Sequence, residues 1–266
     1  MQDASAVTEV LQEVRPMWVA VPAANPHVDY CQTHPEETRK VNVEGTLNVA
    51  RACKALGARM VFFSSDYVFD GLKGIYSEED PTSPLNEYGR QKAQVEAEIL
   101  KTDPANLVVR TSGAYGWQWE PKNFVLQVRE RLQNGQALKV ACDVKYNPTY
   151  VENLADVTAE LVARSCRGIF HVVGPDSLSR YDFACQAASA FGLDASLLEP
   201  VPNASFRATT PRPKESCLLT DKVRRRVPLS LWGVGQGLRD MVDFEISWRR
   251  YAKNLPPPLA RAHKIL

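Results

Sequence analysis

The sequence predicts an α/β fold built on a parallel sheet. Four short apolar runs, at residues 17–21, 60–63, 107–111 and 168–174, are typical of strands that are buried on both faces. Stretches with apolar residues at helical spacing separate these runs. The chain has 266 residues, 44% of them apolar, which is enough for one α/β domain with a smaller lobe.

Two helices are predicted in the first quarter of the chain. The first covers residues 6–14 and ends before Pro16, because proline cannot continue a helix. Its apolar stripe consists of Val7, Val10, Leu11 and Val14. The second runs from about Glu36 to Leu56, and Gly57 follows it as the terminating residue. Its predicted buried stripe consists of Val41, Gly45, Val49, Ala52, Cys53 and Leu56.

Further helices alternate with the later strands. Asn86 is placed to cap a helix whose apolar residues are Val95, Ile99 and Leu100. Helices are also expected over residues 124–132, 152–164 and 181–191. Ser179 caps the last of these, with Asp182 in the third position as a variant of the capping box. Residues 143–149 are expected to form a loop.

Charge and composition exclude several classes of protein. The formal net charge of +1 implies no general affinity for polyanions, so nucleic acid is not an expected partner. No run approaches roughly 18 continuous apolar residues, and the first residues do not resemble a secretory leader, so we expect a cytoplasmic protein without a membrane span. The six cysteines and four histidines have no metal-ligand spacing, which predicts reduced core thiols and no metal site.

The strongest functional pattern lies at the end of the strand 60–63 and on the next helix. Ser64, Ser65 and Asp66 follow that strand directly, at the edge where open α/β sheets bind their ligands. On the helix that Asn86 caps, Tyr88 and Lys92 are four residues apart and therefore share one face, about 6 Å apart along the axis. The sequence therefore predicts a site that combines these side chains.

Tyr88 and Lys92 suggest acid catalysis. A free tyrosine has a pKa of ~10, which is too high for efficient proton transfer at neutral pH. An ammonium ~4 Å away contributes about 4 kcal/mol at an effective dielectric of ~20, or roughly 3 pKa units. We therefore predict that Lys92 lowers the pKa of Tyr88, that Tyr88 donates a proton and that Ser65 holds the substrate oxygen. The alternative is a chance spacing on an amphipathic helix, although Tyr88 is the one tyrosine among nine with a lysine four positions later.

Three segments around this pattern resemble a known family. They are Ser-Ser-Asp-Tyr-Val-Phe-Asp-Gly at 64–71, Tyr-Ser-Glu-Glu-Asp at 76–80 and Pro-Leu-Asn-Glu-Tyr-Gly-Arg-Gln-Lys at 84–92. Together they resemble the dTDP-4-dehydrorhamnose reductase branch of the extended short-chain dehydrogenases/reductases, and the resemblance runs from about Val14 to about Val242. The regulatory β subunit of methionine adenosyltransferase has the same fold and a very similar signature.

The resemblance implies a fold and two alternative functions. The fold is a Rossmann-like parallel sheet with a small substrate-binding lobe. The first function is reduction of a nucleotide-linked 4-keto-deoxysugar with NADP or NAD as the cofactor. The alternative is a non-catalytic regulatory subunit that binds a partner protein.

The resemblance also implies roles for single residues. The catalytic residues would be Ser65, Tyr88 and Lys92; the cofactor would be bound by Ala23, Ala24, Asn42, Ser64, Tyr88 and Lys92; the substrate would be bound by Ser65, Asp66, Asn123 and Arg212. Structural alternatives remain open for three of these positions: a tight turn at Ala23 and Ala24, a helix-surface amide at Asn42 and a salt bridge at Arg212. The family usually has a sugar-binding aromatic residue where Gly113 stands here, and Trp117 or Trp119 lies close enough in sequence to replace it.

The predicted domain organisation follows from the same resemblance. Residues 1–112 and 150–175 form the Rossmann-like core, and residues 113–149 and 176–243 form the substrate-binding lobe. Residues 244–266 form a C-terminal tail with a short helix, a proline spacer and a basic end, which either stays solvated or binds a partner.

The start of the chain departs from a complete dinucleotide fold. Such folds begin with a strand, a glycine-rich turn and a helix N-terminus that hold the pyrophosphate. We expect an N-terminally truncated sheet that lacks roughly 60 residues, or two βα units, which leaves the strand 17–21 as an open apolar edge. The explanations left open are a shortened gene model or isoform, a homodimer or partner subunit that covers the edge, and a natural loss of cofactor binding. The late glycine cluster at 233–237 is better explained as the start of a helix than as a phosphate loop.

Overall fold

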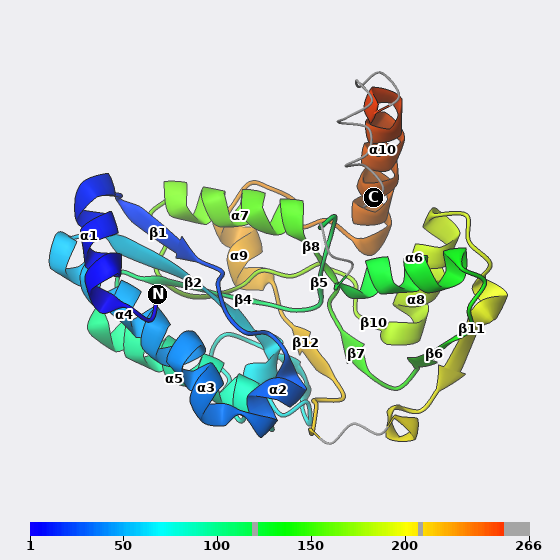
Figure 1. The fold of residues 1–266 in the computed structure, drawn as a ribbon, viewed down its shortest axis with the longest axis horizontal. Coiled ribbons are helices and arrows are strands. Elements are labelled where there is room, and N and C mark those ends of the chain that lie inside the picture. Colours follow the sequence, from blue (N-terminus) through cyan, green and yellow to red (C-terminus); the bar gives the residue numbers. More distant parts are fainter. Residues whose placement is uncertain (119–121, 207–209, 253–266) are drawn as a thin grey trace.

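A computed structural model describes residues 1–118, 122–206 and 210–252 of the chain. Its body is a parallel sheet between two layers of helices, with a smaller lobe beside it and a long C-terminal helix that projects from the lobe (Figure 1). Three stretches lie outside the described residues. They are residues 119–121, which include Trp119, residues 207–209, and residues 253–266, which include the proline spacer and the basic end.

The sheet confirms the predicted α/β fold. Its four strands have the order β1-β2-β4-β9, and all three pairings are parallel. The strands are β1 (Trp18–Val21), β2 (Arg59–Ser65), β4 (Leu107–Thr111) and β9 (Gly168–His171). Ser65 lies opposite Thr111 in the register of β2 and β4, so both strands end at the same edge.

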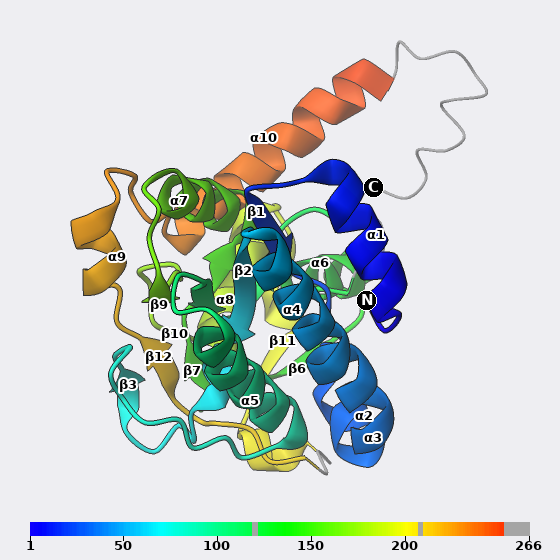
Figure 2. The ribbon, with the colours of Figure 1, turned by 90° about the vertical axis from the view of Figure 1, so that its left-hand side faces the viewer.

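Successive residues of the strands face two separate apolar layers, as the two-residue period of a strand requires. Phe62 and Val108 pack on the side of α1 (Ala4–Val14), α4 (Thr46–Leu56) and α5 (Glu87–Thr102). Val61 and Val109 pack on the opposite side, against α7 (Val151–Ala163) and α9 (Asp221–Arg226). Figure 2 shows these helices on the two sides of the sheet. The sheet is therefore buried on both faces.

The helix predicted over residues 36–56 exists but is not regular. It comprises α3 (Pro35–Arg39), a π-helical turn at Lys40–Gly45 and α4. A π turn holds one more residue than an α turn, so it rotates the residues on either side relative to one another. As a result Val43 is buried while Val41 is only half-buried, and Leu56 is 39% exposed, so the predicted stripe is wrong at both of its ends.

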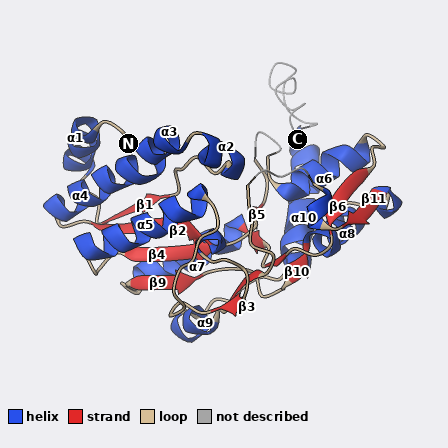
Figure 3. Cartoon of the chain, turned by 90° about the horizontal axis from the view of Figure 1, so that it is seen from below, coloured by secondary structure: helices blue, strands red, loops and turns tan. Residues whose placement is uncertain are grey.

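The lobe is built around a second apolar core. Its elements are α6 (Phe124–Gln133), α8 (Arg180–Ala190), the first part of α10 (Val234–Ala252), and the parallel pair β6 (Leu138–Ala141) and β11 (Leu198–Val201). Ser179 caps α8 through its hydroxyl, which confirms the predicted helix start. Figure 3 shows the helices of the lobe separated from the four-stranded sheet by short strands and loops.

Further short segments complete the fold. The segments are α2 (Val28–Thr33), β3 (Gly74–Tyr76), β5 (Ala114–Tyr115), β7 (Lys145–Tyr146), β8 (Thr149–Tyr150), β10 (Leu178–Ser179) and β12 (Ser216–Leu218). The stretch 143–149 was expected to be a loop, but it contains β7 and the start of β8. Two-residue strands of this kind leave no hydrophobic period in the sequence.

Two of the predicted domain boundaries do not coincide with structural breaks. Val223, Val227 and Leu231 belong to the core beneath the sheet, although the lobe was expected to include them. Helix α10 runs without a break through the expected boundary at residue 243. Its first part is anchored in the lobe by Leu238 and Met241. The glycine cluster at 233–237 precedes and opens α10, as predicted for a helix start.

The outer edge of β1 confirms the expected open apolar edge. Within the described part of the chain, β1 pairs with β2 alone. An apolar groove of about 370 Å³ runs along its free side. The groove is lined by Met1, Asp3, Ala6, Val7, Val10, Leu11, Val19, Ala20, Val21, Pro22, Ala23 and Val49. Backbone groups on this edge remain available for pairing with another strand.

Candidate active site

A cavity of about 700 Å³ opens at the carboxyl ends of β2 and β4, between the body and the lobe. Its walls comprise Pro26, His27, Val28, Asp29, Tyr30, Ser65, Asp66, Tyr67, Tyr88, Ser112, Gly113, Lys122, Val144, Tyr146, Arg180, Arg212, Pro213 and Ser216. Open α/β sheets bind ligands at this edge. Four residues predicted from the sequence, Ser65, Asp66, Tyr88 and Arg212, therefore meet in one cavity.

Ser65 is held by the short 3₁₀ turn that follows β2. Its hydroxyl accepts a hydrogen bond from the Tyr67 N–H at 3.2 Å and donates one to Asp66 Oδ1 at 3.0 Å. Asp66 also accepts a hydrogen bond from the Ser216 hydroxyl of β12 at 2.5 Å. Burial raises the pKa of Asp66, since its side chain is surrounded by protein and pairs with hydroxyls rather than with a cation.

Tyr88 reaches the cavity from the first turn of α5. Asn86 caps this helix by accepting the Gly89 N–H at 2.9 Å, as the sequence predicted. A side chain at residue 89 would collide with the carbonyl oxygen of Tyr67, so glycine allows the helix to approach the turn after β2. The rings of Tyr67 and Tyr88 meet edge to face at 6.1 Å between centroids.

The predicted effect of Lys92 on Tyr88 is wrong in this structure. Burial raises the pKa of Tyr88 above that of a free tyrosine, the charge of Asp66 adds to the rise, and a hydrogen bond with Ser65 opposes it. Lys92 does not contact the phenol oxygen through a hydrogen bond. Its Nζ donates to the Phe63 carbonyl at 2.7 Å and lies 5.8 Å from the centroid of the Tyr88 ring. The ammonium thus stabilises the end of β2.

Burial also acts on Lys92 itself and lowers its pKa from 10.5 to about 8. The unfolded chain therefore binds more protons than the folded chain between these values, and we expect the free energy of unfolding to rise by about 2 kcal/mol as the pH increases from about 8 to 10. Chemical denaturation across this range measures the rise. Lys92→Met should remove it, whereas Lys139→Met, at an exposed position, should not. An equal rise in the Lys92 variant would contradict the assignment.

Arg212 is both a cavity residue and a member of an ion pair. Its Nη2 lies 2.8 Å from Asp29 Oδ2, and the guanidinium holds the pKa of Asp29 below its usual value. The salt bridge that the sequence left open therefore exists. Because the pair lies in the cavity wall, the same guanidinium can also face a bound anion.

Asn42, Asn123 and Ser64 do not line the cavity. The Asn42 amide bonds to both backbone groups of Asn25, and so holds the segment that follows β1. Asn123 caps α6 through the Leu126 N–H and donates to the Gly116 carbonyl, so its side chain is used for structure. The Ser64 hydroxyl is buried and has no hydrogen-bond partner among the described residues.

Ala23 and Ala24 lie in the segment after β1. Ala23 lines the apolar groove beside β1 rather than the large cavity, and Ala24 lines neither of them. The segment has no regular secondary structure, as expected for a turn or for a surface that lies against a ligand.

The comparison with known proteins agrees with this geometry. The family model described as the RmlD substrate binding domain matches residues 1–245. The chain belongs to this RmlD family. The crystal structure of dTDP-4-dehydrorhamnose reductase from Bacillus anthracis, in complex with NADP, is 30% identical to it with a TM-score of 0.85, over 91% of this chain and 85% of that one. The resemblance inferred from the three motifs is thereby confirmed.

Curated relatives of this RmlD-family chain include proteins of two kinds. Methionine adenosyltransferase 2 subunit beta of Bos taurus is 30% identical over 207 residues, which are 75% of this chain and 62% of that protein. The probable low-salt glycan biosynthesis reductase Agl14 of Haloferax volcanii is 31% identical over 220 residues, or 81% of this chain and 73% of that protein. The chain thus spans less than two thirds of the length of the first relative.

One departure of the chain from the RmlD pattern has a structural explanation. Gly113 has a φ of +52°, and a side chain there would collide with the Tyr146 ring. Tyr146 lines the cavity and so provides an aromatic surface next to this position. Of the two tryptophans that the sequence offered for this place, Trp117 does not line the cavity, because its ring packs near Phe244 in the lobe and its indole N–H bonds to the Met241 carbonyl. The other, Trp119, lies outside the described residues.

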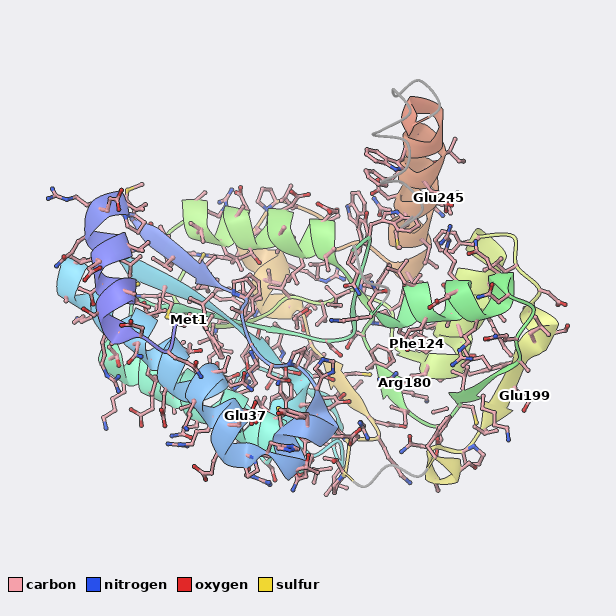
Figure 4. All side chains as sticks on the ribbon, viewed as in Figure 1. Met1, Glu37, Phe124, Arg180, Glu199 and Glu245 are labelled. Carbon is pink, nitrogen blue, oxygen red and sulfur yellow. The ribbon has the colours of Figure 1, made fainter. Side chains whose placement is uncertain are left out.

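The sequence did not single out Arg180, which begins α8 directly after the cap residue. Its guanidinium lies 5.5 Å from the Tyr146 ring centroid and 5.4 Å from that of Phe124. Figure 4 labels Arg180 and Phe124 in the lobe. It also opposes the rise that burial causes in the pKa of Tyr67. An arginine at a helix start gives no functional signal in the sequence. Its role becomes visible once α8 is placed across the cavity from the sheet.

Within the described residues, no group of acidic, histidine and cysteine side chains is arranged to bind a metal ion. Among the same residues, no helix combines the length and the apolar character that crossing a membrane requires. Four of the six cysteines are buried, but Cys142 is exposed and Cys185 half-buried, so the expectation of core thiols holds for only part of the set.

Proposed function

We propose that the chain belongs to a reductase that uses NADPH or NADH to reduce the 4-keto group of a nucleotide-linked deoxysugar. The observation that carries the proposal is the convergence of Ser65, Asp66 and Tyr88 in one cavity wall, with Arg212 and Arg180 in the same cavity. The likeness to a dTDP-4-dehydrorhamnose reductase solved with NADP supports this substrate class. A cytoplasmic location fits this chemistry and is part of the proposal.

The cavity residues have different roles in such a reduction. Tyr88 donates its phenolic proton to the carbonyl oxygen, and the Ser65 hydroxyl orients that oxygen. The raised pKa of Tyr88 keeps its phenol protonated at neutral pH, which a proton donor requires. Arg212 and Arg180 present planar, multidentate donors that suit the diphosphate of a nucleotide sugar. The bound nicotinamide supplies the hydride.

The described residues fit part of an NAD(P) cofactor. The buried hydroxyls of Ser64 and Thr111, at the carboxyl ends of β2 and β4, have no hydrogen-bond partner among the residues that the structure describes, and a polar ligand could satisfy them. Tyr88 and Lys92 lie next to this edge on α5. However, the part of the chain that the structure describes contains no strand, glycine-rich turn and helix in succession that would cradle the pyrophosphate. Roles of Ala23, Ala24, Asn42 and Ser64 in cofactor binding remain part of the proposal.

A coupled binding and turnover experiment tests the proposal. NADPH is titrated against the protein by fluorescence, and its oxidation is then followed after addition of a dTDP-linked 4-keto-6-deoxysugar. We expect oxidation that depends on both the protein and the sugar nucleotide. Binding of neither ligand, or oxidation at the same rate without the sugar, would contradict the proposal.

A partner-binding subunit is the second candidate. The observation that favours it is the open edge of β1 with its apolar groove, which a second copy of the chain or a different subunit could cover. The likeness to methionine adenosyltransferase 2 subunit beta points the same way. Size-exclusion chromatography with and without a methionine adenosyltransferase catalytic subunit tests this function. A stoichiometric complex together with absent NADPH oxidation would favour it over the reductase.

A further inference from the structure

A second cavity, of about 390 Å³, lies at the opposite edge of the sheet from the candidate active site. It is formed where α7 ends, β9 begins and α9 packs against β9, and these elements adjoin one another in Figure 2. The residues that line it are Ser165, Cys166, Arg167, Phe170, Lys222, Arg225 and Arg226. We propose that this cavity binds a small phosphate-bearing ligand with at least two anionic groups.

The charge of the cavity is uniformly positive. Four of its seven lining residues are cationic, and none is acidic. Among the described residues, no carboxylate forms an ion pair with Arg167, Lys222, Arg225 or Arg226. The nearby Arg164 is different, because it pairs with Glu160 on α7. Four uncompensated cations repel one another, so a multivalent anion between them lowers the electrostatic free energy.

Two of these cations are held in place by the protein. Lys222 Nζ donates to the Ile169 carbonyl at 2.7 Å and lies 4.8 Å from the centroid of the Phe170 ring. Arg226 Nε lies 3.4 Å from the Sγ of Cys166. These contacts use one donor of each side chain, which leaves two N–H groups on Lys222 and the terminal Nη groups of Arg226 for a ligand. Prior fixing of the donors reduces the entropy lost on binding.

Ser165 provides an independent observation. It has a φ of +51°, and its N–H bonds to the Val162 carbonyl while the next N–H, of Cys166, bonds to Leu161. The same pair of bonds ends three other helices, where the left-handed residue is Gly57, Gly135 or Gly192. A serine at this position is sterically unfavourable relative to glycine. Ser165 adds a hydroxyl, which can both donate and accept a hydrogen bond, to the wall of the cationic cavity.

A diphosphate fits these observations better than a single phosphate. The cavity, of about 390 Å³, has room for more than one phosphoryl group. Its cationic donors come from two segments, with Lys222, Arg225 and Arg226 on α9 and Arg167 after α7. A planar guanidinium and an ammonium are the side chains that most often bind phosphate oxygens. The alternative is that Arg225 and Arg226 only stabilise the C-terminal end of α9, where cations are favourable.

Calorimetric titration of the chain with inorganic pyrophosphate tests the proposal. Because Arg180 and Arg212 of the candidate active site could also bind a diphosphate, all titrations use a background in which both are replaced, Arg180→Ala with Arg212→Ala. We expect one binding site whose affinity falls with ionic strength. Lys222→Met and Arg226→Ala should each weaken binding about tenfold. Arg131→Ala, an exposed arginine of the lobe, should leave it unchanged.

Ser165→Gly separates a ligand role from a structural one. Glycine relieves the unfavourable backbone conformation, so the variant should melt at a higher temperature. It should at the same time bind pyrophosphate about threefold more weakly, because one hydroxyl contact is lost. Higher stability with unchanged affinity would overturn the role of Ser165.

The source of the diphosphate is distinguished by competition. If adenosine diphosphate displaces pyrophosphate and binds more tightly, the ligand is a nucleotide; if it binds no better, the ligand is a free or simply esterified diphosphate. The absence of binding in the background that lacks Arg180 and Arg212 would overturn the proposal. The proposal would also be overturned if the Lys222→Met and Arg226→Ala variants bound pyrophosphate as tightly as the background protein. A third contrary result would be displacement of pyrophosphate by a single-stranded oligonucleotide with a much steeper salt dependence, because that indicates a general polyanion surface.

Discussion

Glu96→Ala is expected to lower the free energy of unfolding by about 3–5 kcal/mol, because it leaves a buried arginine without its partner. Glu96 of α5 and Arg110 of β4 form a bidentate pair, with Arg110 Nη2 2.7 Å and Nε 3.0 Å from the two carboxylate oxygens. Their side chains are 4% and 3% exposed. His171 cannot take over the role of Glu96, since burial and the nearby Arg110 charge lower its pKa to about 3 and keep the ring neutral.

Thermal and chemical denaturation measure this loss of stability, and two further variants serve as controls. Glu160→Ala breaks an exposed pair with Arg164 and should cost less than about 1 kcal/mol. The double variant Glu96→Leu with Arg110→Met replaces both charges by apolar groups and should regain most of the lost stability. If Glu96→Ala costs no more than Glu160→Ala, the pair does not hold α5 against β4.

Elements with a strong local pattern were predictable from the sequence. The strands β2 and β4 are apolar over their length, and α5 combines the Asn86 cap with buried residues at helical spacing. These local signals agree with the tertiary structure, so each element formed where its pattern indicated. The same reasoning placed Ser65 and Tyr88 at one edge of the sheet, because both positions follow from where β2 ends and α5 begins.

Features that depend on contacts between distant segments were not predictable. The π-helical turn at Lys40–Gly45 rotates a buried face, and the single glycine at its end does not distinguish a π turn from a regular helix. Tyr146 fills the space beside Gly113 only because the two-residue strand β7 lies next to the loop that follows β4. Spacing on a helix placed Lys92 near Tyr88, but it could not show that the ammonium would bond to the Phe63 carbonyl.

The position of Lys92 changes how the candidate proton donor is understood. A phenol whose pKa were lowered to near neutrality would be a stronger acid but would also lose its proton at mildly alkaline pH. In the structure burial raises the pKa of Tyr88, so the group keeps its proton and transfers it only as the substrate oxygen becomes strongly basic. Hydride addition to a carbonyl carbon produces such an oxygen. The phenol can therefore serve as the acid without a lowered pKa in the free protein.

Tyr88→Phe is accordingly expected to reduce kcat for the carbonyl reduction by about 100- to 10 000-fold, the usual contribution of a general acid. The ring still packs edge to face with Tyr67, so folding and the substrate KM should change little. Steady-state kinetics of NADPH oxidation with the sugar nucleotide measure both constants.

Tyr115→Phe is the matched control for the loss of one hydroxyl. This tyrosine is buried in the lobe core, its hydroxyl makes one long bond of 3.4 Å to the Val234 carbonyl, and it does not line the cavity. The control should keep its kcat, whereas Tyr67→Phe, which removes a hydroxyl from the cavity wall, should act mainly on KM. If Tyr88→Phe retained the kcat of the unmodified chain, the proton would have to come from another donor. Since Ser65 donates to Asp66 and Lys92 to a backbone carbonyl, the next candidate would be the Tyr67 hydroxyl in the same cavity wall.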